Sequence, residues 1–208
     1  MKKEEIYSCI DCGTAGCNFG EKRPDFCLTS GLDEDILKKA MAEFEDDNIR
    51  LIAVSAAEVE AENYMKMTRL EETMEFAKKI GASKLGIACC AGLLSEGRII
   101  AKIFRSHGFE VYGVVCKAGM QKKTDIGVPE HCNKVGPHMC NPVLQAMLLN
   151  EAGTELNVLV GLCVGHDSLF YRYSEAPVTT LIAKDRVLCH NPVAAVYQAD
   201  KYYKRIWG

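Results

Sequence analysis

From about residue 32 onward, short apolar runs alternate with longer amphipathic segments, and this alternation limits the possible folds more than any other feature. Short runs that are apolar throughout are typical of strands buried on both faces, and apolar residues at helical spacing indicate helices that cover them. We expect strands within residues 49–58, 83–92, 109–119, 155–165 and, as two strands joined at Lys184 and Asp185, 179–189. We expect helices within residues 32–47, 62–81, 93–108, 138–153 and 192–206. The pattern predicts an α/β fold with an open, mainly parallel sheet and helices on both faces.

Residues 1–30 differ in pattern and composition. They show no helical or strand periodicity and contain four cysteines, three glycines and one proline. A chain of 208 residues is long enough for one sizeable core and a small appendage. We therefore divide the chain into an irregular cysteine-rich metal-binding module, 1–30, and an α/β domain, 31–208, with a thiol-lined site at its strand ends.

Cysteines recur at the ends of the expected strands. Cys90, Cys116 and Cys163 each end a strand, and Cys140 lies at the start of the helix that leads into the strand ending at Cys163. Because the carboxyl ends of parallel strands share one edge, we expect these four thiols to form a metal or sulfur site there. The alternative is that they are small apolar core residues, since free cysteine is among the most buried residue types.

Two local features refine this site. Cys89 and Cys90 are adjacent, and adjacent strand residues point to opposite faces, so Cys90, nearer the loop, is the better candidate. If Asn141 or a neighbour caps the following helix, the first-turn amides will favour a thiolate at Cys140.

Three further polar residues follow the strand-end cysteines. His166 and Asp167 come directly after Cys163 in GLCVGHD, and His190 follows Cys189. Imidazole exchanges protons near neutral pH, so His166 and Asp167 are the candidates for proton transfer or for orienting a ligand. The alternative for Asp167 is a helix cap.

The N-terminal cysteines form a compact group of four soft ligands: Cys9, Cys12, Cys17 and Cys27. Four thiolates on a glycine-bearing loop suit a tetrahedral zinc ion or a four-cysteine iron–sulfur cluster. The spacing does not match a complete zinc ribbon or the common ferredoxin runs. With a second thiol-rich site in the same chain, we favour a [4Fe–4S] cluster here, with zinc as the alternative.

Charge and hydropathy exclude several classes of function. The formal net charge is -3, and no basic block follows the pattern of a nucleic-acid-binding protein. There is neither a signal-peptide h-region after MKKEEIYS nor an apolar run long enough to span a bilayer, so we expect a cytoplasmic protein with no membrane partner. A reducing cytosol disfavours disulfides among the 11 cysteines. No phosphate-binding glycine motif indicates a nucleotide.

The motifs CIDCGTAGC, CKAG, MCNP, GLCVGHD and APVTTLIAKDRVLCHNP, in this order, resemble those of an uncharacterised prokaryotic family of cysteine-rich predicted metal-binding proteins, a domain of unknown function. The resemblance covers nearly the whole chain and implies that the two parts belong together. The residues that match the family's motifs are Cys9, Cys12, Cys17, Cys27, Cys116, Cys140 and Cys163. We do not assign a family role to Cys89, Cys132 or Cys189 from this resemblance.

These observations support a first hypothesis of an iron–sulfur redox protein of an anaerobic type of metabolism, with the N-terminal cluster serving a second iron–sulfur cluster or metal at the sheet edge. The rival is a non-catalytic protein that binds or senses zinc or another soft metal. Thiol–disulfide exchange is a third class, disfavoured because no C-x-x-C opens a helix in the α/β part. Whether the chain is an enzyme stays open, with iron–sulfur oxidoreductase and sulfur-transfer enzyme as the fitting classes. A redox partner protein and a homo-oligomer are the partners considered.

Overall fold

The structure is a computed structural model that describes residues 6–20 and 22–208. It contains two compact units, one ending at Val54 and one comprising Ser55–Gly208. The boundary expected from the sequence is at residue 30. The difference arises because the residues after 30 first form an exposed helix with no buried side chain, and the sheet begins much later.

The first unit is mostly irregular up to residue 33. A short 3-10 turn, η1 (Cys9–Asp11), is held by a reciprocal cap between Ser8 and Asp11, in which the Ser8 amide donates to the carboxylate at 2.7 Å. Helix α1 (Glu34–Ala42) begins where Asp33 accepts the first-turn amides, and the turn η2 (Glu43–Glu45) follows it. Helix α2 (Asp47–Asn63) begins in this unit and continues beyond Val54.

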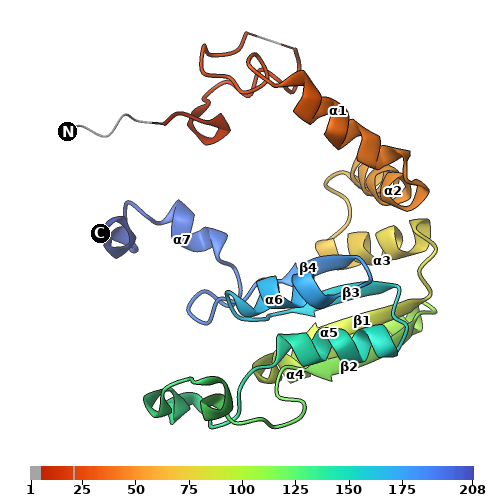
Figure 1. Cartoon of the computed structure of the whole chain (residues 1–208), viewed down its shortest axis with the longest axis vertical. Coiled ribbons are helices and arrows are strands. Elements are labelled where there is room, and N and C mark those ends of the chain that lie inside the picture. The colour runs from red at the N-terminus through yellow and green to blue at the C-terminus, as the bar shows by residue number, and fades with distance from the viewer. Residues whose placement is uncertain (1–5, 21) are drawn as a thin grey trace. The chain divides into compact units, whose positions relative to one another are not determined.

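The second unit is built around a sheet of four parallel strands in the order β2-β1-β3-β4 (Figure 1). The strands are β1 (Lys84–Cys89), β2 (Glu110–Val115), β3 (Leu156–Val160) and β4 (Val178–Ile182). The helices that connect or precede them are α3 (Arg69–Lys79), α4 (Leu94–Ser106), α5 (Pro142–Glu151) and α6 (His166–Tyr173). The predicted open parallel α/β sheet is confirmed.

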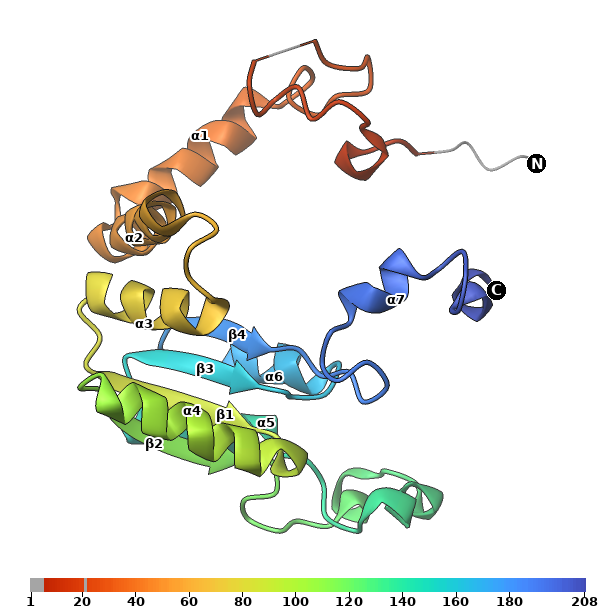
Figure 2. The same ribbon diagram turned by 180° about the vertical axis from the view of Figure 1, so that it is seen from behind.

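Helices cover both faces of this sheet, with α3 and α4 on one side and α5 and α6 on the other (Figure 2). On the first side, Phe104 of α4 packs with Leu85 and Val158, all fully buried. On the second side, Leu149 of α5 and Phe170 of α6 pack over the strands. The central strands are therefore apolar on both faces, which explains why their sequences lack polar alternation.

Two expected elements near residue 60 are wrong. Residues 49–58, expected as a strand, lie inside helix α2. Asp46 caps that helix by accepting the Asn48 and Ile49 amides at 2.8 and 3.1 Å, and the alanines of the run favour a helix. The helix expected over 62–81 is divided, because Thr68 forms a capping box with Glu71 and starts α3 afresh.

The C-terminal expectations are also partly wrong. Only the first of the two strands expected within 179–189 forms, because Asp185 accepts the Val187 and Leu188 amides in a turn, and Cys189 and His190 have positive φ of 49° and 64°. The helix expected over 192–206 is reduced to α7 (Val193–Tyr197) and the turn η6 (Lys204–Trp207). Helix α6 was not expected as a separate element.

Within the described ranges, no helix has both the length and the apolar composition needed to cross a bilayer.

Candidate thiol site at the sheet edge

The strand order places a topological switch between β1 and β3. From β1 the chain proceeds to β2 on one side and then returns to β3 on the other, and α4 and α5 cover opposite faces. Open α/β folds bind ligands outside the carboxyl ends of the strands at such a point. Cys90 follows β1 there, and Cys163 lies three residues after β3.

Local backbone bonds fix two of the strand-end thiols. The Cys116 amide donates to the Cys89 carbonyl at 2.9 Å, which extends the pairing of β1 and β2 past their ends. The Asn141 amide in turn donates to the Cys116 carbonyl at 2.8 Å, and the Asn141 side chain caps α5 by accepting the Leu144 amide. The expected cap is confirmed, and it holds Cys140 next to Cys116.

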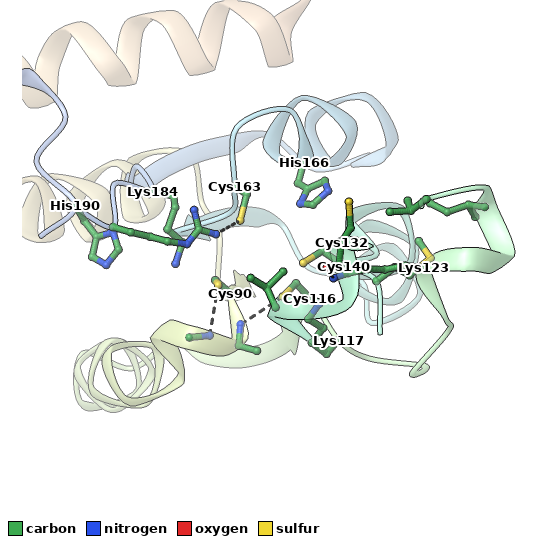
Figure 3. A pocket seen from close by; sticks show the side chains of 17 residues that line it. Cys90, Cys116, Lys117, Lys123, Cys132, Cys140, Cys163, His166, Lys184 and His190 are labelled. Carbon is green, nitrogen blue, oxygen red and sulfur yellow. Dashed lines mark hydrogen bonds between the residues drawn. The ribbon is translucent and has the colours of Figure 1, made fainter. Parts of the chain in front are cut away.

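The four predicted strand-end cysteines line one small cavity, which we call the thiol cavity. Figure 3 shows the same four cysteines among the residues of a larger pocket at this edge. The lining of the thiol cavity consists of Cys90, Cys116, Cys140, Cys163, Gln145, Leu162 and His166. These residues come from the ends of three strands and from the starts of α5 and α6. The structure therefore brings together residues that are separated by more than seventy positions in the chain.

Donors surround the sulfurs. The Gly92 amide donates to Cys90 Sγ and the Ala91 amide donates to Cys116 Sγ, each at 3.4 Å, because the chain turns into a 3-10 helix, η3 (Ala91–Leu93), directly after β1. The guanidinium of Arg186 donates to Cys163 Sγ at 3.0 Å. Such donors stabilise sulfur in its thiolate or metal-bound form.

Hydrogen bonds among three of the thiols shift their pKa values in opposite directions. A hydrogen bond with Cys116 lowers the pKa of Cys140 to about 3, and the corresponding bond lowers the pKa of Cys90 to about 5. The same two hydrogen bonds, with burial, raise the pKa of Cys116. In the metal-free chain, Cys116 therefore stays protonated between two thiolates.

Gln145 is fully buried, and its amide group has a fixed orientation. Its Nε2 donates to the Val114 carbonyl at 2.7 Å and to the Cys89 carbonyl at 3.2 Å. Its Oε1 is buried and has no hydrogen-bond partner among the described residues, and the side chain lines the thiol cavity. Because a buried acceptor without a donor is costly, the cavity is suited to a group that donates a hydrogen bond.

A larger cavity of about 900 Å³ opens from the thiol cavity, and we call it the edge pocket. The four thiols and His166 belong to its lining, as do basic residues that the sequence analysis did not single out: Lys117, Lys123, Lys184 and Arg186. A signal was present, because three of these residues follow β2 or β4 closely in the stretches CKAG and AKDR. Cations directly after parallel strands point to the same edge as the thiols do.

The two predicted proton-transfer residues differ in placement. His166 lies in the first turn of α6 and lines both cavities, and the neighbouring Cys140 sulfur raises the pKa of its imidazole. Asp167 is absent from both linings. Its Oδ1 accepts the Gly165 and Ser168 amides at 3.0 and 2.9 Å, because these amides at the start of α6 need an acceptor. Asp167 thus serves the helix terminus.

The remaining cysteines of the second unit and His190 lie in different surroundings. Cys89 packs into the core on the α4 face, and burial raises its pKa to about 11. Cys132 and His190 line the edge pocket, whereas Cys189 is exposed and lines neither cavity. The preference for Cys90 over Cys89 agrees with the opposite faces that the two side chains occupy.

In the first unit, all four N-terminal cysteines line a separate cavity, of about 130 Å³, together with Arg23, Phe26 and Thr29. A hydrogen bond from Thr14 lowers the pKa of Cys12. Burial acts to raise the pKa of Cys27, but hydrogen bonds from Thr29 and Ser30 hold it below its ordinary value. Both thiols therefore tend towards the thiolate that a metal ion requires.

No group of three or more His, Cys, Asp or Glu side chains within 6–20 and 22–208 has the close spacing of a formed metal site. The residues nevertheless fit a soft metal by donor chemistry, since each cavity is lined by four thiols. In the thiol cavity the fit extends to the amide donors that already face sulfur.

Comparison with known proteins agrees with the resemblance seen in the motifs. Residues 27–181 match a family described as "Protein of unknown function (DUF1847)". The chain belongs to the DUF1847 family. This DUF1847 chain is also 50% identical over 173 residues to the uncharacterized protein MJ0455 of Methanocaldococcus jannaschii, an alignment that covers 82% of this chain and 86% of that protein. The part matched by the DUF1847 family contains all four strand-end thiols but, of the N-terminal four, only Cys27.

Proposed function

We propose that this DUF1847 protein is an iron–sulfur metalloprotein that is redox-active. Cys9, Cys12, Cys17 and Cys27 would hold a [4Fe–4S] cluster. Cys90, Cys116, Cys140 and Cys163 would hold a second iron–sulfur cluster or metal at the carboxyl edge of the sheet. The reducing cytoplasm is the compartment that suits so many free thiols.

The observation that carries this proposal is the convergence of four thiols on one cavity at the topological switch of the sheet. Cys89 packs in the core, and its thiol donates to the Cys90 and Leu93 carbonyls. Cys116 is buried as well, but its sulfur and that of Cys90 accept backbone amides, and that of Cys163 accepts a guanidinium. These contacts favour anionic sulfur, which is the form that binds metal.

When bound, an iron–sulfur cluster would supply one-electron transfer. The chain's own residues would set its surroundings. The Ala91 and Gly92 amides and Arg186 would donate to the ligand sulfurs, which is the kind of contact that tunes a metal centre. His166, beside Cys140, would hold or release a proton at the open side of the site, where it faces the edge pocket.

The first experiment is anaerobic isolation of the full chain, followed by iron, zinc and sulfide analysis and a visible absorption spectrum. We expect iron and sulfide in similar amounts and the broad visible absorption of a cluster. A colourless protein that carries zinc and no sulfide would overturn the iron–sulfur assignment and leave the rival, a non-catalytic zinc-binding or sensing protein.

Substitution of one cysteine in each group tests the two proposed metal sites independently. Cys116→Ser should lower the iron and sulfide content while leaving the share held by the N-terminal cysteines, and Cys12→Ser should do the reverse. Cys189→Ser is the matched control, because that thiol is exposed and lines neither cavity at the sheet edge. If Cys116→Ser leaves the metal content equal to that of the control, the strand-end thiols do not bind metal.

A further inference from the structure

The edge pocket has an unbalanced set of charges. Four cationic side chains line it, Lys117, Lys123, Lys184 and Arg186, and no Asp or Glu belongs to its lining. None of the ion pairs formed by the described residues includes any of these four cations. A cluster of cations without carboxylates in a concave site attracts anions.

Two of the three lysines donate to backbone carbonyls, and Lys117 and Lys184 also interact with the Cys140 and Cys90 sulfurs. Lys117 Nζ donates to the His138 carbonyl at 2.5 Å, and Lys123 Nζ donates to the Cys132 carbonyl at 2.6 Å. Lys123 is only 9% exposed, so its charge is largely removed from water. A backbone carbonyl offers a dipole and no countercharge, and a buried cation gains much from an anionic partner.

The carboxylates near the pocket are used elsewhere. Asp167 and Asp185 accept backbone amides in their own turns. Glu96 lies near enough to Lys184 to interact with it electrostatically but is absent from the lining. The thiolates are therefore the negative charges in the pocket lining. In the proposed function they bind a metal, which balances their charge.

Part of the pocket lining is apolar. It is formed by Ile126, Val128, Val135 and Met139, from the segment that runs between β2 and α5 and contains the turns η4 (Lys123–Ile126) and η5 (Glu130–Val135). Ile126 is 63% exposed and Val135 is 76% exposed. Exposed aliphatic side chains and cations in the lining of one pocket fit a ligand with one charged and one apolar end.

We propose that the edge pocket binds a small organic anion, with its acidic group against Lys184 and Arg186 beside the thiols and its apolar body against the wall formed by Ile126 and Val135. This inference rests on the proposed function, because it takes the thiolate charge to be engaged by metal. The volume of about 900 Å³ is within the range of sites for small molecules. The anion would lie next to the metal-binding sulfurs, in the position of a substrate.

The test uses three probes that separate charge from apolar contact: hexanoate, the neutral hexanamide, and acetate. Binding to the anaerobically isolated full chain is measured at constant ionic strength by ligand-observed NMR. We expect hexanoate to bind about tenfold more tightly than either of the other two, which corresponds to one charge-assisted contact or to a few buried methylenes. Equal binding of hexanoate and hexanamide would overturn the proposal, and this comparison needs no variant.

Variants then locate the site. Lys184→Gln and Arg186→Gln should each weaken hexanoate binding about tenfold and leave hexanamide unchanged. Lys38→Gln, on the exposed helix α1, is the matched control for the loss of one positive charge. The assignment would be contradicted if the control variant lost hexanoate binding. It would also be contradicted if both pocket variants bound hexanoate as tightly as the unchanged chain does.

Metal analysis of the same samples distinguishes the two proposals. If hexanoate fails to bind a chain that holds metal at the strand-end thiols, the anion site is wrong and the proposed function stands. If hexanoate binds but Cys116→Ser does not lower the metal content, the anion site stands and the second metal site is wrong.

Discussion

Arg186 donates a hydrogen bond from its guanidinium to the Sγ of Cys163 at 3.0 Å. The two residues follow different strands, Cys163 after β3 and Arg186 after β4, and these strands are neighbours in the sheet. A charge-assisted donor to sulfur is worth more than a neutral one, and it favours the thiolate over the thiol. The pairing makes Arg186 a positioning residue for the thiol site.

The first prediction concerns this pair. Arg186→Gln should weaken metal retention at the strand-end thiols by about 10–100-fold, the usual cost of losing a partner of a metal ligand. The measurement is the rate at which a chelator removes metal from the isolated protein. Arg172→Gln, at an exposed position of α6, is the control. Metal loss at the same rate in both variants would show that Arg186 has no part in holding the site.

The second prediction concerns pH in the metal-free chain. Cys90, with a pKa of about 5, is a thiolate throughout the range from pH 6 to pH 8, whereas Cys89, with a pKa of about 11, is a thiol. Because the thiolate is the nucleophile, Cys90 should be alkylated by iodoacetamide at a rate that is nearly constant over this range. Peptide mapping by mass spectrometry measures each cysteine. A tenfold rise of the Cys90 rate for each pH unit would contradict the lowered pKa.

The elements predicted well from the sequence are those whose sequence and tertiary environment agree. The runs that became β1 and β3 are apolar because they are covered on both sides, whereas the edge strand β2 keeps several exposed residues. The edge position of the thiols followed from topology, since the carboxyl ends of parallel strands must meet.

The errors arose where one sequence pattern fits two structures. Residues 49–58 form a short apolar run, and length alone could not separate a buried strand from a helix whose start depends on a single cap at Asp46. The basic lining of the edge pocket was missed because Lys117 and Lys184 look like ordinary loop cations until the strand order places them together. For Asp167 the sequence left proton transfer and a helix cap open, and its hydrogen bonds with the Gly165 and Ser168 amides favour the cap.

The third prediction concerns Gln145. Gln145→Leu would leave the carbonyls of Cys89 and Val114 without their side-chain donor at the ends of β1 and β2. The Cys89 carbonyl would keep the Cys116 amide as a donor, so we expect the free energy of unfolding to fall by about 1–3 kcal/mol, the cost of one lost buried partner. Urea denaturation of the metal-free chain measures it. Gln121→Leu is the control, because Gln121 is exposed. This substitution should change the free energy of unfolding little.

The last prediction concerns two glycines in neighbouring strands. A Cβ at Gly86 of β1 would lie 1.9 Å from Asn157 Oδ1, a distance that no two such atoms can share. Asn157 cannot move freely, because it is fully buried, its Oδ1 accepts the Thr154 hydroxyl at 2.8 Å, and its Nδ2 donates to Ser174 at 2.8 Å. Gly86→Ala must therefore displace a hydrogen-bonded side chain in the centre of the sheet.

We expect Gly86→Ala to lower the free energy of unfolding by about 1–3 kcal/mol or more, as overpacking of a close-packed core does. Gly113 in β2 is the matched control, because a Cβ there would meet its nearest atom at 3.8 Å, which is ordinary contact. Gly113→Ala should be neutral or slightly stabilising, since alanine restricts the unfolded chain more than glycine does. Equal stability of the two variants in urea denaturation would mean that Asn157 can leave its place at little cost, and that its close contact with β1 does not fix the packing of this face of the sheet.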